Sequence, residues 1–305
     1  MSSFVVGDTY RYQDVANGVV SGDALRQSIE ANGFVVLKEV FSPAEIARMR
    51  EQARGYLEAR GLRLGLGRTR SNVAADEKAL AWVFGHDRII QAINWSLDQS
   101  KVVFTGHSDA HMNMVAGWHK DSETRYGSYF SKPCIGAESC RVYKIGIYLQ
   151  DHSNNNTGLK VRRGSHKVAN LSEGELVTLY SGLGDIVIFD VRISHCGDLP
   201  DGVEKVMQKV SRVLKGRHAQ RQDPDLFVKI REAYVKMRRD EQKMSIFFTF
   251  GMDNIFTSDF SRTNMQRQME QVRLAGDRAK IDFPVELRER LSAAGIGLPD
   301  FTGLA

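Results

Sequence analysis

The sequence predicts a barrel or double-sheet jelly roll of short β-strands, preceded by a layer of helices. Three observations support this fold class. Strand-like runs separated by turn signals follow one another between Val102 and Val191. Helical spacing dominates the first hundred residues, and strand character returns at Met244–Phe250 after a polar, helix-prone interruption.

Composition limits the class of protein. The 305 residues suit one large domain or two modest ones, and the 42% hydrophobic and 26% charged contents are ordinary for a globular chain. No apolar run approaches the ~20 residues that span a bilayer, and the N-terminus lacks the pattern of a signal peptide. The three cysteines, Cys134, Cys140 and Cys196, have no Cys-x-x-Cys spacing. We therefore expect a cytoplasmic protein.

The formal net charge of +5 is mild for this length. It fits an anionic small-molecule substrate or an acidic partner surface, and it does not amount to the basic stripe of a nucleic-acid-binding protein. We therefore expect a small-molecule substrate, no nucleic acid and no transmembrane segment.

The first hundred residues carry clear helix signals. Gly22–Ala31 is predicted as a helix that ends before Gly33, and Phe34–Phe41 follows as a strand. In Ser42-Pro43-Ala44-Glu45, the Ser can cap a helix, the Pro fits its first turn, and the Glu completes a capping box. Residues 76–98 are predicted as two helices with a break near Gly85.

Strands follow from Val102 onward. Arg141–Leu149 has one apolar face and a second face that mixes Lys144, Gly146 and Tyr148, which predicts a half-buried strand. The tail, 258–293, is predicted as helix. The remaining predicted strands are Val102–Thr105, Met112–Trp118, Leu159–Val161, Leu176–Tyr180, Asp185–Val191 and Met244–Phe250.

The segment with the clearest chemical meaning is Gly117–Asp121. On an extended segment, His119 and Asp121 point to the same side, so an imidazole nitrogen and a carboxylate oxygen can reach one metal ion. A second His would complete the two-His, one-carboxylate set that leaves three positions open on Fe(II). The best candidate is His195, which ends the strand-like run that begins at Gly184.

The order of these features resembles the phytanoyl-CoA dioxygenase-like branch of the Fe(II)/2-oxoglutarate oxygenases. The resemblance covers roughly residues 25 to 250. It implies a mainly β fold with flanking helices: a double-stranded β-helix, or jelly roll, with an N-terminal helical layer and a helical insertion. The matching segments are Gly33–Leu37, Trp118–Asp121, the turn Gly158–His166, Gly184-Asp185 with Phe189, and His195.

The resemblance also implies a domain layout. The whole chain, 1–305, would form a single oxygenase domain. Residues 1–100 would form the helical layer, and 101–197 together with 243–256 the jelly-roll core. Residues 198–242 would be a helical insertion that could act as a lid, and 257–305 a helical tail.

The activity that the resemblance implies is a hydroxylation. His119, Asp121 and His195 would bind Fe(II), with 2-oxoglutarate as co-substrate and O₂ as oxidant. The substrate would be a small or medium-sized metabolite, anionic or sugar-like, that is hydroxylated at an unactivated C–H bond. Succinate and CO₂ would be released. Halogenating relatives have lost the carboxylate ligand, so Asp121 favours hydroxylation.

The sequence departs from the family pattern at two positions. Arg163 stands where Pro is usual in the Gly-Ser-His turn. In the family, an Arg binds the far carboxylate of 2-oxoglutarate. In this sequence its position is occupied by Lys243, and Arg239 is a second candidate for the role. Four further residues are predicted near the site: Asn113 to orient the 2-oxo acid, and Arg125, Tyr126 and His111 to contact substrate.

Two other functions stay open from the sequence. One is a jelly-roll metalloenzyme that does not use 2-oxoglutarate, which the lysine at the anchor position keeps possible. The other is a non-catalytic binding protein on a decayed oxygenase fold, against which the complete set of His119, Asp121 and His195 argues.

Overall fold

The protein is described by a computed structural model that covers residues 8–64, 67–76, 78–97, 101–124, 127–154, 158–197, 201–215, 229–230, 232–234, 237, 242–278, 280, 282–299 and 301. Its strands are β1 Thr9–Arg11, β2 Phe34–Lys38, β3 Leu62–Leu64, β4 Gly67–Ser71, β5 Val102–Met112, β6 Glu123–Thr124, β7 Gly127–Ser128, β8 Val142–Tyr148, β9 Lys160–Arg163, β10 Glu175–Thr178, β11 Ile186–Asp190, β12 His195–Cys196, β13 Met244–Met252 and β14 Ile296–Gly297. Its helices are α1 Tyr12–Ala16, α2 Gly22–Asn32, α3 Pro43–Arg60, α4 Val73–Asp76, α5 Ala81–Phe84, α6 Asp87–Leu97, α7 Gly202–Lys215, α9 Ile255–Leu274 and α10 Val285–Ala293, with short 3₁₀ turns at Lys78–Leu80 and Ser165–Lys167.

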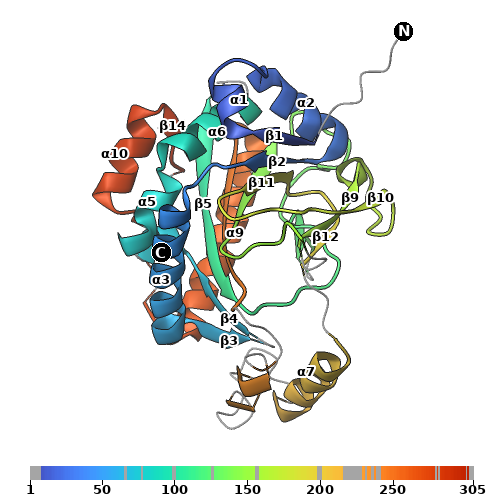
Figure 1. The fold of residues 1–305 in the computed structure, drawn as a ribbon, viewed down its shortest axis with the longest axis vertical. Helices are drawn as coiled ribbons and strands as arrows, with labels where there is room; N and C mark the ends of the chain where they lie inside the picture. Colours follow the sequence, from blue (N-terminus) through green and yellow to red (C-terminus); the bar gives the residue numbers. More distant parts are fainter. Residues whose placement is uncertain are drawn as a thin grey trace.

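Two sheets face one another and form a jelly roll. The large sheet runs β1-β2-β11-β8-β13-β5-β4-β3, with β14 added beside β5. The small sheet runs β10-β9-β12, and the backbone of His119 pairs with His195 at its open side. The inner faces of the sheets meet through a cluster that includes Phe34, Leu159, Val161 and Phe189. In Figure 1 the small sheet and the helices α3 and α5 lie on opposite sides of the large sheet.

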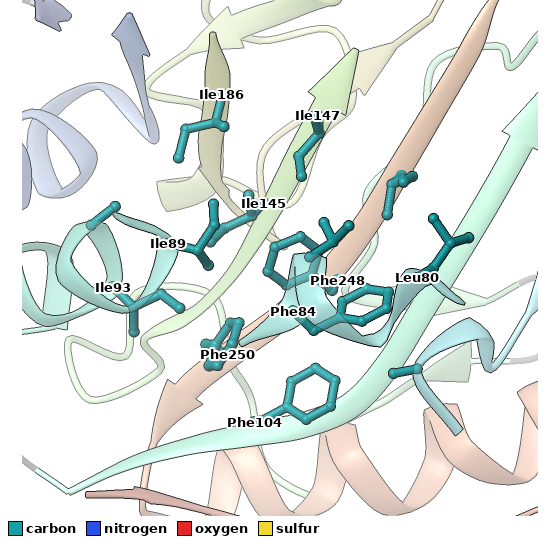
Figure 2. Close-up of a cluster of buried hydrophobic side chains, with 14 of the residues drawn as sticks. Leu80, Phe84, Ile89, Ile93, Phe104, Ile145, Ile147, Ile186, Phe248 and Phe250 are labelled. Atoms are coloured by element: carbon teal, nitrogen blue, oxygen red, sulfur yellow. The ribbon is translucent and has the colours of Figure 1, made fainter. Parts of the chain in front are cut away.

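Helices α3, α5 and α6 cover the outer face of the large sheet, whereas α9 contributes residues to the cavity on its inner face. Because successive side chains of a strand point to opposite faces, β8 and β13 send alternate residues outward. Ile145, Ile147, Phe248 and Phe250 meet Phe84 of α5 in a fully buried cluster (Figure 2). This packed layer gives the sheet a rigid support on the side away from the small sheet.

Local signals account for the helix ends. Ser42 accepts a hydrogen bond from the Glu45 backbone N–H, and the Glu45 carboxylate accepts one from the Ser42 N–H, so the predicted capping box forms at α3. Gly33 takes the left-handed conformation, with φ of 88°, and ends α2 as predicted.

The structure corrects three predictions about elements. The strand Arg141–Leu149 was expected to be half-buried, but all of β8 is buried, because helices cover one face and the small sheet encloses the other. The segments Val102–Thr105 and Met112–Trp118 were expected as two strands, whereas β5 runs unbroken from Val102 to Met112 and strand structure ends there. The tail helix predicted over 258–293 is divided into α9 and α10.

The predicted insertion, 198–242, contains α7, which lies at the lower end of the molecule in Figure 1. Most of the insertion after α7 falls outside the described residues, and its role as a lid stays a prediction. No helix in the described part of the chain is long and apolar enough to cross a membrane.

Candidate metal centre

The three residues predicted as metal ligands lie together at one end of the space between the sheets. His119 and His195 face each other across an antiparallel pair, in which the N–H of each donates to the carbonyl of the other. Asp121 follows in the turn after His119. Each of the three side chains offers one candidate ligand atom, and these three atoms lie within 4.8 Å of one another. A set of two imidazoles and one carboxylate is therefore assembled by the fold.

Both imidazoles are oriented in the same way. The Nδ1 of His119 lies 2.7 Å from the carbonyl oxygen of Gly117, and the Nδ1 of His195 lies 3.1 Å from that of Ile193. A carbonyl can only accept, so each Nδ1 carries the proton and each Nε2 keeps its lone pair. Burial lowers the pKa of His195 to about 3, which keeps this imidazole neutral near pH 7. Both Nε2 atoms are thus prepared to bind a cation.

Asp121 is held as a carboxylate. Its Oδ2 accepts a hydrogen bond of 2.8 Å from the ammonium of Lys144, which rises from β8. Burial disfavours the charge, but the nearby Lys144, His195 and His119 outweigh it, so the pKa of Asp121 lies far below its usual range. The carboxylate is charged at any pH at which the protein is expected to work.

The turn that carries His119 and Asp121 is fastened by a buried lysine between them. The Nζ of Lys120 donates to the carbonyl oxygens of Ser165 and Arg192, each at 2.6 Å. The Ser165 hydroxyl oxygen in turn accepts the N–H of Ser194, next to His195. The Gly-Ser-His turn therefore holds both ligand-bearing segments at a fixed separation.

A cavity of about 370 Å³ opens beside the three ligands. At its other end, the sheet register sets Tyr148 of β8 and His111 of β5 on either side of Ser245 of β13. The hydroxyl of Tyr148 and the Nδ1 of His111 are buried and have no hydrogen-bond partner among the residues that the structure describes. Burial lowers the pKa of His111 to about 4. Unpaired buried polar atoms are costly, so a polar ligand is expected at this end.

The other predicted site residues are placed as follows. Lys243 lines the cavity just before β13. The Oδ1 of Asn113 accepts the backbone N–H of Lys243, and Asn113 is not among the cavity-lining residues. His111 lines the cavity. Arg125, Tyr126 and Arg239 lie outside the described residues, and their roles stay predictions.

Sequence reasoning missed Lys144, Lys120 and the Ser165 hydroxyl as parts of this site. The signal for Lys144 was present, since a lysine in the middle of an otherwise apolar strand has no reason to be there unless it meets an anion. Lys120 gave no such signal, because its role depends on two carbonyls contributed by distant segments.

Comparison with solved structures finds the same fold at low sequence identity. The non-heme alpha ketoglutarate dependent epimerase SnoN from nogalamycin biosynthesis matches with a TM-score of 0.53 and 14% identity, covering 76% of this chain and 83% of that one. The non-heme alpha ketoglutarate dependent carbocyclase SnoK from the same biosynthesis matches with a TM-score of 0.52 and 13% identity, covering 81% of this chain and 87% of that one. A search of curated protein sequences found no match.

The family model for phytanoyl-CoA dioxygenase matches residues 29–198, which is more than half of the chain. The matched region runs from the end of α2 through His195 and so contains His119, Asp121 and His195. On this match and on the jelly-roll fold, the chain belongs to the phytanoyl-CoA dioxygenase family, whose enzymes use Fe(II), 2-oxoglutarate and O₂.

Proposed function

We propose that this protein is an Fe(II)- and 2-oxoglutarate-dependent dioxygenase that hydroxylates an unactivated C–H bond of a small or medium-sized metabolite, with succinate and CO₂ as co-products. The observation that carries the proposal is the set of two imidazoles with unprotonated Nε2 atoms and one carboxylate, beside a cavity.

The donor set fits Fe(II). Two neutral imidazoles and one carboxylate suit this ion and leave coordination positions open for other ligands. His119, Asp121 and His195 would hold it. Their orientation is set by backbone carbonyls and by Lys144 before any ion arrives, so little conformational freedom remains to be lost on binding.

The cavity fits a dicarboxylic 2-oxo acid. With the 2-oxo acid group at the iron, the far carboxylate would lie toward the end where the Tyr148 hydroxyl and the His111 Nδ1 have no hydrogen-bond partner in the described part of the chain. Lys243 lies just before β13, two residues from Ser245, and lines the same cavity. It would supply the positive charge at this end. This is the residue that the sequence predicts for the role.

Bound Fe(II), with 2-oxoglutarate and O₂, would supply the oxidising chemistry. The protein's own contribution is to place the reactants and exclude water. Apolar side chains of Met114, Leu159 and Phe247 line the cavity and shield its interior. The Tyr148 hydroxyl stays protonated, because burial raises its pKa, and can therefore donate to a carboxylate.

An anionic or sugar-like substrate is supported by the charges of the cavity wall. The cavity is lined by Lys120, Lys144, Lys243 and Arg267, against the acidic Asp109, Asp121 and Glu123. The fold alone does not select the reaction, since SnoN is named as an epimerase and SnoK as a carbocyclase. Asp121 supports hydroxylation over halogenation because it occupies the position that a halide would need.

The test is substrate-dependent formation of succinate. Under anaerobic conditions, Fe(II) and 2-oxoglutarate should first give a weak charge-transfer band at roughly 500–530 nm, the mark of a chelated 2-oxo acid. A panel of carboxylated and sugar-derived metabolites is then screened with O₂ for release of succinate and for a product heavier by one oxygen atom.

His119→Ala and Asp121→Ala should each abolish both the band and succinate formation. The matched control is His86→Ala, which removes an imidazole that pairs with Glu45, away from the cavity, and should keep both. Activity retained in either ligand variant would disprove the assignment of the iron site. Iron binding without the band would favour a metalloenzyme that does not use 2-oxoglutarate.

A further inference from the structure

Lys144 occupies a defined position beside the three candidate ligands. Its Nζ lies 2.8 Å from Asp121 Oδ2 and 5.1 Å from the centre of the Phe247 ring, and its side chain is only 11% exposed. Gly146, the next residue on the same face of β8, leaves the space for that ring, because a Cβ there would lie 2.9 Å from it. The ammonium is therefore held between a carboxylate and an aromatic face.

The two oxygens of Asp121 are nearly equivalent apart from this contact. Oδ1 lies 3.8 Å from the Nε2 of His119, and Oδ2 lies 3.4 Å from the Nε2 of His195. A carboxylate that faces both imidazoles in this way could bind a metal ion through one oxygen or through both. Lys144 makes the oxygens different, because it bonds to Oδ2.

Electrostatics then decides which oxygen the metal takes. Two cations that share one carboxylate repel each other, and the repulsion weakens as their separation grows. A metal ion would therefore be favoured on Oδ1, while Oδ2 would remain with the ammonium of Lys144. The other lysine next to the ligands, Lys120, is already bound by the carbonyls of Ser165 and Arg192 and does not compete for Asp121.

The number of oxygens matters for the chemistry. Two imidazoles and a single carboxylate oxygen leave three positions on Fe(II), which suffice for a chelating 2-oxo acid and one further ligand. If both oxygens of Asp121 bound, the last of these positions would be filled and O₂ would have no place to bind.

We propose that Lys144 is a positioning residue that keeps Asp121 a single-oxygen ligand and thereby preserves the third open position on the iron. The inference rests on the proposed function. It concerns a residue that is not itself a candidate ligand. It predicts that, without Lys144, iron and 2-oxoglutarate still bind but the third coordination position on the iron is no longer open.

The experiment uses nitric oxide as a probe of that position. The full-length protein and Lys144→Met, whose unbranched side chain is one atom shorter than that of lysine and carries no charge, are loaded anaerobically with Fe(II) and saturating 2-oxoglutarate. The charge-transfer band reports chelation, and the electron paramagnetic resonance signal of the nitric oxide adduct reports the third position. Lys144→Met should keep the band and lose roughly 10- to 100-fold of the nitric oxide signal per iron, the usual effect of removing an orienting partner.

Lys243→Met is the matched control, since it removes a second lysine of the same cavity. It should weaken 2-oxoglutarate binding, yet at saturating 2-oxoglutarate its nitric oxide signal should equal that of the wild-type protein. The two lysine variants would then show opposite defects.

Two results would overturn the inference while the proposed function stands. One is a full nitric oxide signal in Lys144→Met. The other is loss of iron from folded Lys144→Met, which would mean that the lysine only holds Asp121 in place. Absence of the band in the wild-type protein would instead overturn the proposed function, and the inference with it. If Lys144→Met fails to fold, Lys144→Gln carries the same test.

Discussion

The two faces of the large sheet are built from the same strands and serve different ends. On the outer face, Ile145 and Phe248 are at most 1% exposed and pack against the helices (Figure 2). On the inner face, Lys144 and Tyr148 of β8 and His111 of β5 line the cavity. Because neighbouring residues of a strand point to opposite faces, we expect changes on the outer face to alter stability without altering the chemistry of the cavity.

The largest effect on stability is expected from the outer face. Phe248→Ala removes a fully buried ring that packs against Phe84, and it should lower the free energy of unfolding by about 3–5 kcal/mol. The metal affinity of the protein that remains folded should not change. Urea denaturation measures the first quantity, and titration with Co(II) measures the second. Loss of a partner that orients a metal ligand lowers metal affinity by about tenfold or more. A fall in Co(II) affinity of that size in Phe248→Ala would show that the outer face also affects the metal site.

The turn between the ligands should couple stability to metal binding, unlike either face. Lys120→Met leaves the carbonyls of Ser165 and Arg192 without their ammonium donor, at a cost of about 2–3 kcal/mol. Metal affinity should fall as well, because the turn that carries His119 and Asp121 loses its tether. Lys167→Met, at an exposed position of the adjacent turn, is the control and should change neither quantity. A stable Lys120→Met protein would show that the tether is dispensable.

The sequence was sufficient to single out the three candidate ligands that the fold brings together, but not their surroundings. His119, Asp121 and His195 could be predicted because local spacing and the order of motifs along the chain identify them. The role of Lys144 depends on register: β8 lies between β11 and β13, with Phe189 and Thr249 as the partners of Lys144. These strands are far apart in the sequence, and no local sequence signal shows that they are neighbours in the sheet.

The same limit explains the wrong prediction for β8. Its alternation of apolar and polar residues is typical of a strand with one face in water. In the fold, the polar face meets the cavity, where Lys144 pairs with Asp121, and the whole strand is buried. A polar face predicts the presence of partners, but whether these are water or protein depends on what packs against the strand. The capping box of α3 was predictable because all its partners lie within four residues.

The inner face should also make stability depend on pH, whereas the apolar outer face should not. His111 titrates near 6.5 when unfolded and at about 4 in the folded protein, because burial disfavours its charge. Between these values the unfolded chain binds more protons, so the contribution is complete above pH 6.5 and is lost as the pH falls toward 4. The metal-free protein should lose about 1–3 kcal/mol over this range from His111 alone. His111→Asn should reduce the dependence measured by urea denaturation without abolishing it, because burial also lowers the pKa of His195; an unchanged slope would contradict the assignment to His111.

The smallest effect on stability is expected at Gly146, where β8 packs against the ring of Phe247. In Gly146→Ala, the new Cβ would lie 2.9 Å from the ring of Phe247, so the ring must shift and its contact with the ammonium of Lys144 would change. Crowding of this kind costs about 1–3 kcal/mol, and the lower chain entropy of alanine offsets part of it, so the net loss should be about 1 kcal/mol. Gly55→Ala is the control: no atom lies within 4 Å of its Cβ, and in a helix the change should stabilise by about 0.5–1 kcal/mol. Because the Phe247 ring also contacts the ammonium of Lys144, the substitution should weaken the nitric oxide signal of the iron-loaded protein, although by less than Lys144→Met does. A loss of stability with a full signal would show that the Phe247 ring supports the sheet without helping to place the lysine.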